Sequence, residues 1–202
     1  MRKLIVAEHI SLDGVVQSPG APQEDAGGGF ALGGWTVPYG DPAIGKFVTD
    51  MLAPPFEMLL GRGTYDIFAG YWPKAPAGPI ADRFNGAAKH VATHRPGALA
   101  WRNSHALSGE IAAAVRALKD RDGPDLLTWG SPGLVRQLLA EGLVDELRLI
   151  LYPVVLGRGK RLFDGGARPS AFTLAESGRT AGGVMLQRYV RGGEVRTGTF
   201  GE

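Results

Sequence analysis

Apolar residues recur along the chain in two patterns, and the two patterns alternate as far as residue 155. Short, nearly continuous apolar runs bounded by Gly, Pro or Asp are typical of buried strands. Segments with apolar residues three and four positions apart are typical of helices that cover a core with one face. The runs that predict strands are 3–9, 56–60, 89–93, 125–129 and 146–155, and two more are expected at 172–176 and 184–190.

Helix starts are marked by capping residues and by proline. Asp41 followed by Pro42 predicts a capped helix with one apolar face, which ends before a pair of prolines. Further helices are expected to begin at Thr64 and at Ser108, and another runs from the turn after residue 129 to about Glu141. This order predicts an α/β fold with a largely parallel sheet covered by helices and an antiparallel pair at its C-terminal end.

Nothing in the composition divides the chain, so we expect a single domain over 1–202. The 31 glycines and 14 prolines are scattered without a period, which indicates many tight turns and no repeat architecture. The stretch 17–40 is rich in both and is long enough to form a flap over a binding site. The last residues, 192–202, are expected to be a flexible tail.

Charge and cysteine content exclude several functions. The net charge is +2 without a basic block, so no nucleic-acid partner is expected. No cysteine is present, which excludes disulfides and thiolate metal sites. Glu8 and His9 interrupt the first apolar run, and no run approaches the roughly 18 apolar residues of a membrane span. We therefore expect a cytoplasmic protein without a membrane partner.

Two segments share a design that suits phosphate: a buried strand, a glycine-rich turn and the start of a helix. A helix start exposes unpaired N–H groups and the positive end of the helix dipole, both of which favour an anion. One such turn is often needed for backbone geometry alone, but two in one domain favour a dinucleotide with its diphosphate. The first turn contains Gly61, Arg62 and Thr64, and the second comprises Gly130, Ser131, Pro132, Gly133 and Leu134.

Basic side chains follow neighbouring strands at the same predicted edge of the sheet. Arg62 lies in the first turn, and Thr93, His94 and Arg95 follow the next strand. Arginine can hold an additional phosphate by bidentate hydrogen bonds, which would favour NADPH over NADH. The alternative is that both arginines are solvated surface residues.

Asp13 closely follows the first strand, at the edge where open α/β sheets bind ligands. It either contacts a polar substrate and relays a proton, or forms an Asx-turn with the next glycine. Trp35 and Tyr65 are candidates for an aromatic substrate pocket, together with Tyr39 and Trp72. Single aromatic residues are more often part of a core, so each of these candidates has a structural alternative.

Other apparent motifs fail on inspection. The segment 40–46 has the spacing of a P-loop, but Phe47 stands where Ser or Thr must bind magnesium. His90 and His94 lie on a predicted strand, without a third ligand nearby, so no metal site is expected. The three spaced glycines of a Rossmann turn are missing near the N-terminus.

Taken in order, the motifs of the chain closely resemble one family. It contains the C-terminal reductase domain of the bifunctional riboflavin-biosynthesis deaminase–reductase and the dihydrofolate reductase family proteins. The resemblance runs from about residue 2 to residue 191. The segments that carry it are Ser11-Leu12-Asp13-Gly14, Gly61-Arg62-Gly63-Thr64-Tyr65, 89–93, Trp129-Gly130-Ser131-Pro132, 143–147 and 153–157.

The resemblance implies a dihydrofolate-reductase-like, three-layer α/β/α fold around a mixed, mostly parallel sheet of about eight strands. It also implies an NADP-dependent oxidoreductase that uses NADPH to reduce a small heterocyclic, carbonyl or imine substrate. Ala7 would offer its backbone to the nicotinamide carboxamide, and Asp13 would face the nicotinamide and the substrate. In the two turns, the resemblance assigns phosphate contacts to Gly61, Arg62 and Thr64 and diphosphate contacts to Gly130, Ser131, Pro132, Gly133 and Leu134. It assigns contacts on the 2′-phosphate side of the adenosine to Thr93, His94 and Arg95.

The resemblance to dihydrofolate reductases themselves is incomplete. They carry a pterin-binding carboxylate in the helix before the first turn, and the corresponding region here surrounds Gly45, with Asp41 and Asp50 about one turn to either side. Folate is therefore not the expected substrate. Two alternatives to a reductase are a nucleotide-binding module without catalysis and a dimerisation module. We expect a homodimer, with the apolar run 147–156 meeting the partner.

Overall fold

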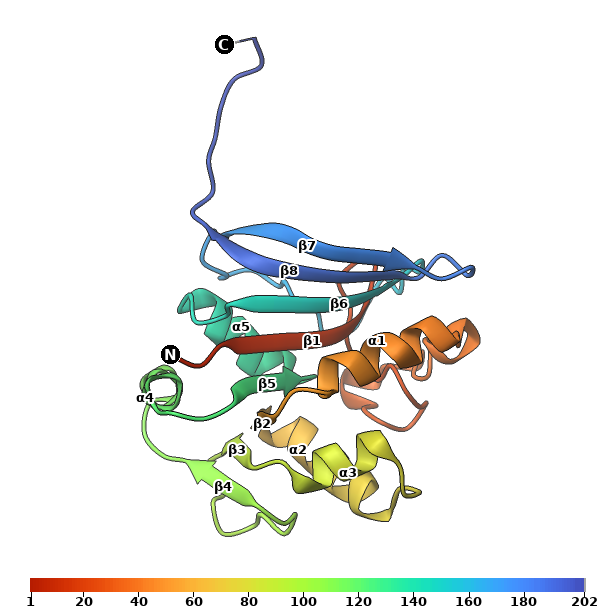
Figure 1. The fold of residues 1–202 in the computed structure, drawn as a ribbon. Helices are drawn as coiled ribbons and strands as arrows, with labels where there is room; N and C mark the ends of the chain where they lie inside the picture. The colour runs from red at the N-terminus through yellow and green to blue at the C-terminus, as the bar shows by residue number, and fades with distance from the viewer. Residues whose placement is uncertain (202) are drawn as a thin grey trace.

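The computed structural model describes residues 1–201 and contains an eight-stranded sheet with helices on both faces (Figure 1). The strand order is β4-β3-β2-β5-β1-β6-β8-β7. All neighbouring pairs are parallel except β6–β8 and β8–β7, so the predicted α/β fold is confirmed. The strands are β1 (Leu4–Ser11), β2 (Phe56–Gly61), β3 (Lys89–Ala92), β4 (Ser104–Leu107), β5 (Asp125–Trp129), β6 (Glu146–Tyr152), β7 (Ala171–Arg179) and β8 (Met185–Gly193).

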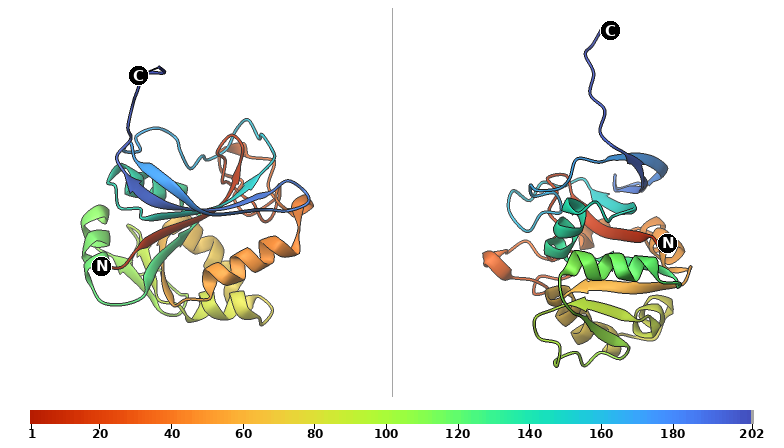
Figure 2. Two further views of the ribbon diagram at one scale, coloured as in Figure 1. Left: turned by 45° about the horizontal axis from the view of Figure 1, so that its top comes forward. Right: turned by 90° about the vertical axis from the view of Figure 1, so that its left-hand side faces the viewer.

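The helices form the two outer layers (Figure 2). On one face lie α1 (Pro42–Leu52), α2 (Arg62–Tyr71) and α3 (Pro79–Gly86), and on the other lie α4 (Ile111–Asp120) and α5 (Pro132–Ala140). Short 3-10 turns occur at η1 (Gly27–Gly29), η2 (Val37–Tyr39) and η3 (Trp72–Lys74). No helix in residues 1–201 is both long enough and apolar enough to cross a membrane.

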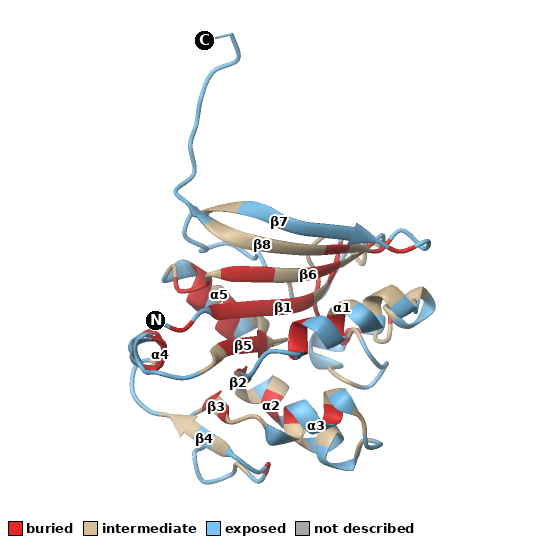
Figure 3. Cartoon of the chain, in the orientation of Figure 1, coloured by how far each residue is buried: buried red, intermediate tan, exposed pale blue. Residues whose placement is uncertain are grey.

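Each face of the sheet has its own core because successive residues of a strand point to opposite faces. In the central strand β1, Ile5 and Ala7 pack with residues of α1, α2 and α3, whereas Leu4 and Val6 pack with α4 and α5. Burial is greatest in β1, β5 and β6 and least in the outer strand β7 (Figure 3).

The arrangement around β1 defines where a ligand can bind. The chain leaves β1 and forms β2 at a distance, and β5 later fills the position between them. Ala7 of β1 then pairs with Trp129 at the end of β5. A crevice outside the carboxyl ends of strands at such a reversal is the usual ligand site of an open α/β sheet.

Some elements differ from the sequence-based prediction. The helix α3 and the strand β4 were not expected, because α3 is short and β4 has only four residues, two of them polar. The cap of α4 is Glu110 instead of Ser108, since the Glu110 carboxylate accepts from the N–H groups of Ala112 and Ala113 over 2.8 and 2.7 Å. The helix α2 begins at Arg62, two positions before Thr64.

The C-terminal part of the chain bears on the expected homodimer. The strand β6, which we expected to meet a partner, lies inside the sheet between β1 and β8, and its Leu147 and Leu149 belong to the core. The outer strand is β7, most of whose residues are exposed. Beyond Gly193 the described residues leave the sheet without forming a further helix or strand (Figure 2). Homodimerisation stays a prediction, and β7 offers the exposed edge for it.

Candidate active site

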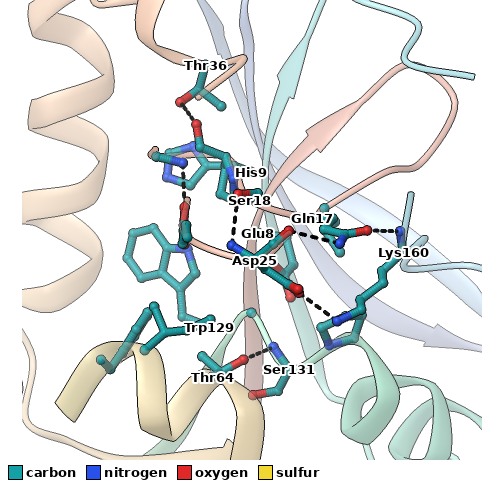
Figure 4. Close-up of a pocket in the computed structure, with 18 of the residues that line it drawn as sticks. Glu8, His9, Gln17, Ser18, Asp25, Thr36, Thr64, Trp129, Ser131 and Lys160 are labelled. Atoms are coloured by element: carbon teal, nitrogen blue, oxygen red, sulfur yellow. Dashed lines mark hydrogen bonds and ion pairs between the residues drawn. The ribbon is translucent and has the colours of Figure 1, made fainter. Parts of the chain in front are cut away.

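A cavity of about 340 Å³ opens at the carboxyl ends of β1 and β5, under the flap 17–40 (Figure 4). Its walls come from β1, β5, α1, α2, α3 and the flap, so segments that are distant in the sequence meet there. It therefore occupies the crevice that the strand order predicts. We describe it as two parts, an aromatic half formed by Phe68, Trp72, Phe84 and Trp129 and a polar half formed by Glu8, Gln17, Ser18, Asp25, Ser131 and Lys160.

The aromatic half is built by rings that contact one another edge to face. The centroids of Trp72 and Phe84 are 4.7 Å apart, and those of Phe84 and Trp129 are 6.0 Å apart. On the α1 side, Gly45 and Val48 complete the wall and contribute no ionisable group. Such a surface suits a flat heterocyclic ring.

The polar half lies under the flap, which is held closed over it. The Gln17 amide N–H groups donate to the carbonyls of Asp25 and Gly27, and the Lys160 ammonium pairs with Asp25 over 2.6 Å. The indole N–H of Trp35 donates to the carbonyl of Gln17 over 2.8 Å. The flap is therefore fixed at both of its ends by hydrogen bonds to buried residues.

The two glycine-rich turns lie side by side and are joined by hydrogen bonds. The N–H of Gly61 donates to Oγ of Ser131 over 2.9 Å, and the N–H of Ser131 donates to Oγ1 of Thr64 over 2.8 Å. Each hydroxyl therefore holds the turn opposite its own. We call this pair of turns, Gly61–Thr64 and Gly130–Leu134, the cradle.

The backbone of the second turn is tightly specified. Gly130 has a φ of +69°, and a Cβ atom there would stand 3.0 Å from Cγ2 of Thr64. Glycine is thus required at this position by the fold itself, before any ligand binds. Ser131 follows with a φ of 61°, a conformation that is uncommon for serine. At the start of α5, Pro132 has no N–H, so the free donors of the first helical turn are those of Gly133 and Leu134.

A second cavity, of about 450 Å³, lies on the other side of the cradle. Thr64, Gly130, Ser131 and Pro132 line the cavity under the flap, whereas Gly61, Gly133 and Leu134 line the second one. Thr93 and His94 line the second cavity as well. The structure thus brings these predicted site residues to one continuous surface that runs between the two cavities.

The two candidate arginines differ in how far they are engaged. Nε of Arg62 pairs with Asp66 over 2.8 Å, and Nη1 donates to the carbonyl of Arg95 over 3.1 Å. The Arg95 side chain is 68% exposed and lies 3.7 Å from Asp66. Arg62 is therefore committed to holding the loop after β3, and Arg95 is free to turn toward a ligand.

Asp13 does not line either cavity. Its carboxylate accepts from the Ser11 hydroxyl over 2.7 Å and from the N–H groups of Leu156 and Gly157 over 3.0 and 2.9 Å, and Arg161 lies 3.3 Å away. Burial raises the pKa of Asp13, but these hydrogen bonds outweigh it and hold the pKa well below its usual value. In this geometry Asp13 ties the loop after β6 to the end of β1.

Three further candidates are packed into the core. Trp35 is buried with its ring edge-on to Tyr152, and it anchors the flap. Tyr65 is buried, and its hydroxyl accepts from the N–H of Trp101 over 2.9 Å. Ala7 is buried in β1 beside the end of β5. The side chains of these residues do not line the cavity, whose aromatic wall comes from α2, α3 and β5 instead.

Two wall residues, Glu8 and His9, were not expected at the site. Both lie within the strand expected at 3–9, whose apolar run they interrupt, and β1 continues through them to Ser11. Burial raises the pKa of Glu8 well above its usual value and lowers that of His9 to about 4, so both favour their uncharged forms. Nδ1 of His9 lies 2.9 Å from the Tyr152 hydroxyl. A charged residue inside an otherwise buried strand, at the ligand-binding edge, was the available signal.

No group of three or more His, Cys, Asp or Glu residues in the described part of the chain could hold a metal ion. The sheet, the cradle and the two cavities together define an α/β protein with a candidate ligand site at the carboxyl ends of its strands. The sequence matches the RibD C-terminal domain family over residues 2–186, and the chain belongs to this family. It is also 28% identical to the uncharacterized protein YyaP of Bacillus subtilis over 167 residues, which cover 80% of each chain.

Solved structures share the fold. A putative riboflavin biosynthesis protein from Shewanella sp. PV-4 matches with a TM-score of 0.68 and 20% identity over 95% of this chain and 99% of its own. A pyrimidine reductase-like protein from Corynebacterium diphtheriae matches with a TM-score of 0.60 and 13% identity over 97% and 93%. Dihydrofolate reductase from Enterococcus faecalis, solved with NADP(H), has the same TM-score of 0.60 and 13% identity over 94% and 96%. The dihydrofolate-reductase-like fold is thereby confirmed.

Proposed function

We propose that the protein is an NADPH-dependent reductase of a small heterocyclic substrate with a C=N or C=O bond. The observation that carries this proposal is the cradle between two cavities, joined through Thr64 and Ser131. A dinucleotide has the matching shape, with a diphosphate between two ring systems. Its phosphates would lie on the cradle, near the free N–H groups of Gly133 and Leu134.

The two cavities differ in a way that orients the cofactor. Hydride transfer needs the nicotinamide and the substrate in one water-poor space, and the cavity under the flap has aromatic and buried walls. The adenosine end would then lie in the second cavity, beside Thr93 and His94. When bound, the reduced nicotinamide supplies the hydride. The residues of the chain orient the two rings against Trp129, and the flap excludes water.

The walls also constrain the substrate. In dihydrofolate reductases a carboxylate of the corresponding helix binds the pterin, but α1 presents Gly45 and Val48 to the cavity. Asp41 is used as the cap of α1, where it accepts from Ala43 N–H over 2.8 Å. Asp50 pairs with Lys46 over 2.6 Å on the surface. We therefore propose a pyrimidine-like ring or another flat heterocycle in preference to dihydrofolate.

The preference for NADPH can be tested at Arg95. Its exposed guanidinium is proposed to contact the 2′-phosphate, and a charge-assisted hydrogen bond contributes about 1.5–3 kcal/mol, or roughly tenfold or more in affinity. In calorimetry, Arg95→Ala should bind NADPH about tenfold more weakly than the wild type does, and its affinity for NADH should be almost unchanged. Arg116→Ala, a control in the surface pair with Glu141, should leave both affinities unchanged. An equal loss for the two cofactors in Arg95→Ala would refute the assignment.

Turnover separates the reductase from its alternatives. NADPH oxidation should be measured by the loss of reduced-nicotinamide absorbance, with pyrimidine and flavin-precursor carbonyl compounds as substrates. Oxidation that depends on such a compound supports the proposal. Tight NADPH binding without turnover of any of them would favour a nucleotide-binding module. The absence of dinucleotide binding would favour the dimerisation module and overturn the proposal.

A further inference from the structure

Glu8 is an acidic residue that the proposed cofactor site does not yet use. It lies on β1, is 2% exposed, and its side chain lines the cavity under the flap (Figure 4). Its Oε1 atom is fully buried and has no hydrogen-bond partner. A buried polar atom without a partner costs about 1–3 kcal/mol, so such an atom at a cavity wall calls for an explanation.

The other charged groups around this cavity do not supply that partner. Lys160 faces the cavity from the loop after β6, and its ammonium is paired with Asp25 of the flap over 2.6 Å. The amide oxygen of Gln17 accepts from the N–H of Lys160, and its N–H groups are used within the flap. Glu24 faces the cavity from the flap, where burial raises its pKa and its carboxyl group accepts from the N–H of Gly20 over 2.7 Å, and as an acid it brings no positive charge to Glu8.

The strand neighbours of Glu8 also leave it unpaired. His9 lines the same cavity, but successive side chains of a strand diverge, and burial lowers its pKa to about 4, so it is neutral near pH 7 and gives Glu8 no positive partner. From β5, the backbone of Gly130 lies against the Glu8 carboxyl and lowers its pKa in part, but burial outweighs this contact. Burial therefore favours the protonated form of Glu8.

The position of Glu8 relates it to the cradle. Gly130 belongs both to the cradle and to the cavity wall beside Glu8. A dinucleotide whose phosphates lie on the cradle would place the ring at its near end against this wall. Glu8 is thus an acid in contact with a cradle residue at the cavity wall.

We propose that Glu8 contacts the nicotinamide ring and is a catalytic residue that exchanges its proton as the ring changes redox state. This inference rests on the proposed function. Glu8 would break its Oε1–H bond and give the proton to the nitrogen or oxygen of the C=N or C=O bond of the substrate, while bound NADPH would supply a hydride to the carbon of that bond. The Glu8 carboxylate would then be the counter-ion of the oxidised, cationic ring.

The step leaves the charge of the cavity unchanged. Before it, the ring and Glu8 are both neutral, and after it they are a cation and an anion in contact. An ion pair inside a cavity interacts more strongly than in water, so ionised Glu8 stabilises the oxidised ring. Binding of NADP⁺ to the protein should therefore release a proton from Glu8, and binding of NADPH should not.

Calorimetry in buffers of different ionisation enthalpy counts the protons released on binding. For the wild type between about pH 6 and pH 8, NADP⁺ binding should release up to about one proton per site, and NADPH binding close to none. Glu8→Gln should release no proton when NADP⁺ binds. Its affinity for NADP⁺ should be about tenfold or more below that of the wild type, and its affinity for NADPH should stay within about twofold. Glu141→Gln, a control whose carboxylate pairs with Arg116 on the surface and lines neither cavity, should behave like the wild type.

Infrared spectroscopy gives an independent readout. The carbonyl band of a protonated carboxyl group should be present in the empty wild type, absent from Glu8→Gln, and lost when NADP⁺ is added to the wild type. If both cofactors bind but Glu8→Gln releases as many protons as the wild type, the role of Glu8 is overturned and the proposed reductase function stands. If neither dinucleotide binds, both the role of Glu8 and the proposed reductase function are overturned.

Discussion

Glu8 and Asp13 are two carboxyl groups from the same strand end with opposite surroundings. Asp13 lies in the loop after β1, where a hydroxyl, two backbone N–H groups and Arg161 surround its carboxylate. Glu8 lies in the strand, buried, with one oxygen that has no partner. The pKa is lowered at Asp13, where hydrogen bonds outweigh burial, and it is raised at Glu8 by burial itself.

The difference shows how a structural acid and a reactive one can be told apart. A carboxylate whose acceptor sites are filled by the protein stabilises the fold and has little capacity left for a ligand. A carboxyl group that the protein leaves without a partner destabilises the fold, and a site that keeps one gains a proton to exchange. The following predictions test this contrast.

The largest effect is expected for Asp13→Ala. This change leaves the N–H groups of Leu156 and Gly157 and the guanidinium of Arg161 without their acceptor, so it should lower the free energy of unfolding by about 3 kcal/mol near neutral pH. Because the pKa of Asp13 is depressed in the folded state, its contribution is present above the unfolded pKa and is lost as pH falls through the folded value.

Chemical denaturation at about pH 7 and at about pH 3 measures both parts of this prediction. The difference in the free energy of unfolding between Asp13→Ala and the wild type should be smaller at the lower pH. NADPH affinity, determined where both proteins are folded, should change little. A variant of unaltered stability that has lost cofactor binding would instead place Asp13 at the ligand.

A smaller effect of opposite sign is expected for Glu8→Gln. The folded-state pKa of Glu8 lies above its unfolded value, so its burial costs nothing below the unfolded pKa and destabilises the protein as pH rises through the folded pKa. Glu8→Gln has no carboxyl group at this position, so its stability does not fall in this way as pH rises. Its Tm should equal that of the wild type near pH 4 and exceed it by several degrees near pH 8, because each unit by which the folded pKa is raised costs about 1.4 kcal/mol, and about 1 kcal/mol shifts the Tm of a chain of this size by about 2–4 °C.

Differential scanning calorimetry of the cofactor-free proteins across this pH range provides the measurement. Glu24→Gln serves as the comparison, since Glu24 faces the same cavity from the flap and burial also raises its pKa. A Glu8→Gln protein that is less stable than the wild type at every pH would mean that Glu8 has a structural partner, and the contrast with Asp13 would disappear.

The fold was largely predictable because its strands are apolar and its turns carry glycine or proline. The run 125–129 and the cap Asp41 followed directly from these patterns, and the structure confirms both. The elements that were missed, α3 and β4, have weak periodicity and lie at the edge of the sheet, where burial imposes little pattern. Their formation depends on the neighbouring strands β2 and β3 more than on their own residues.

The candidate site was predictable in its backbone and less so in its side chains. The cradle residues follow from the strand–turn–helix order, which is local in the sequence. Which aromatic ring faces a cavity depends on helix packing, so Trp35 and Tyr65 were chosen although Phe68 and Trp129 form the wall. The sequence places Glu8 in the first strand but does not show that its side chain borders a cavity, because that depends on the flap and on β5.

The smallest effect concerns His9, which tests whether burial keeps the β1 wall of the cavity uncharged. Burial lowers the pKa of His9 to about 4, and its Nδ1 lies 2.9 Å from the Tyr152 hydroxyl. In a pH titration followed by NMR, the ring resonance that disappears in His9→Gln should titrate with a midpoint near 4.

Because this pKa is depressed, His9 contributes stability above its unfolded pKa of about 6.5, and that contribution is lost as pH falls toward 4. His9→Gln should therefore lose less stability than the wild type between about pH 7 and pH 4. A midpoint near 6.5 would mean that water reaches His9 freely, and the protonated state assigned to Glu8 on the same strand would then lose its physical basis.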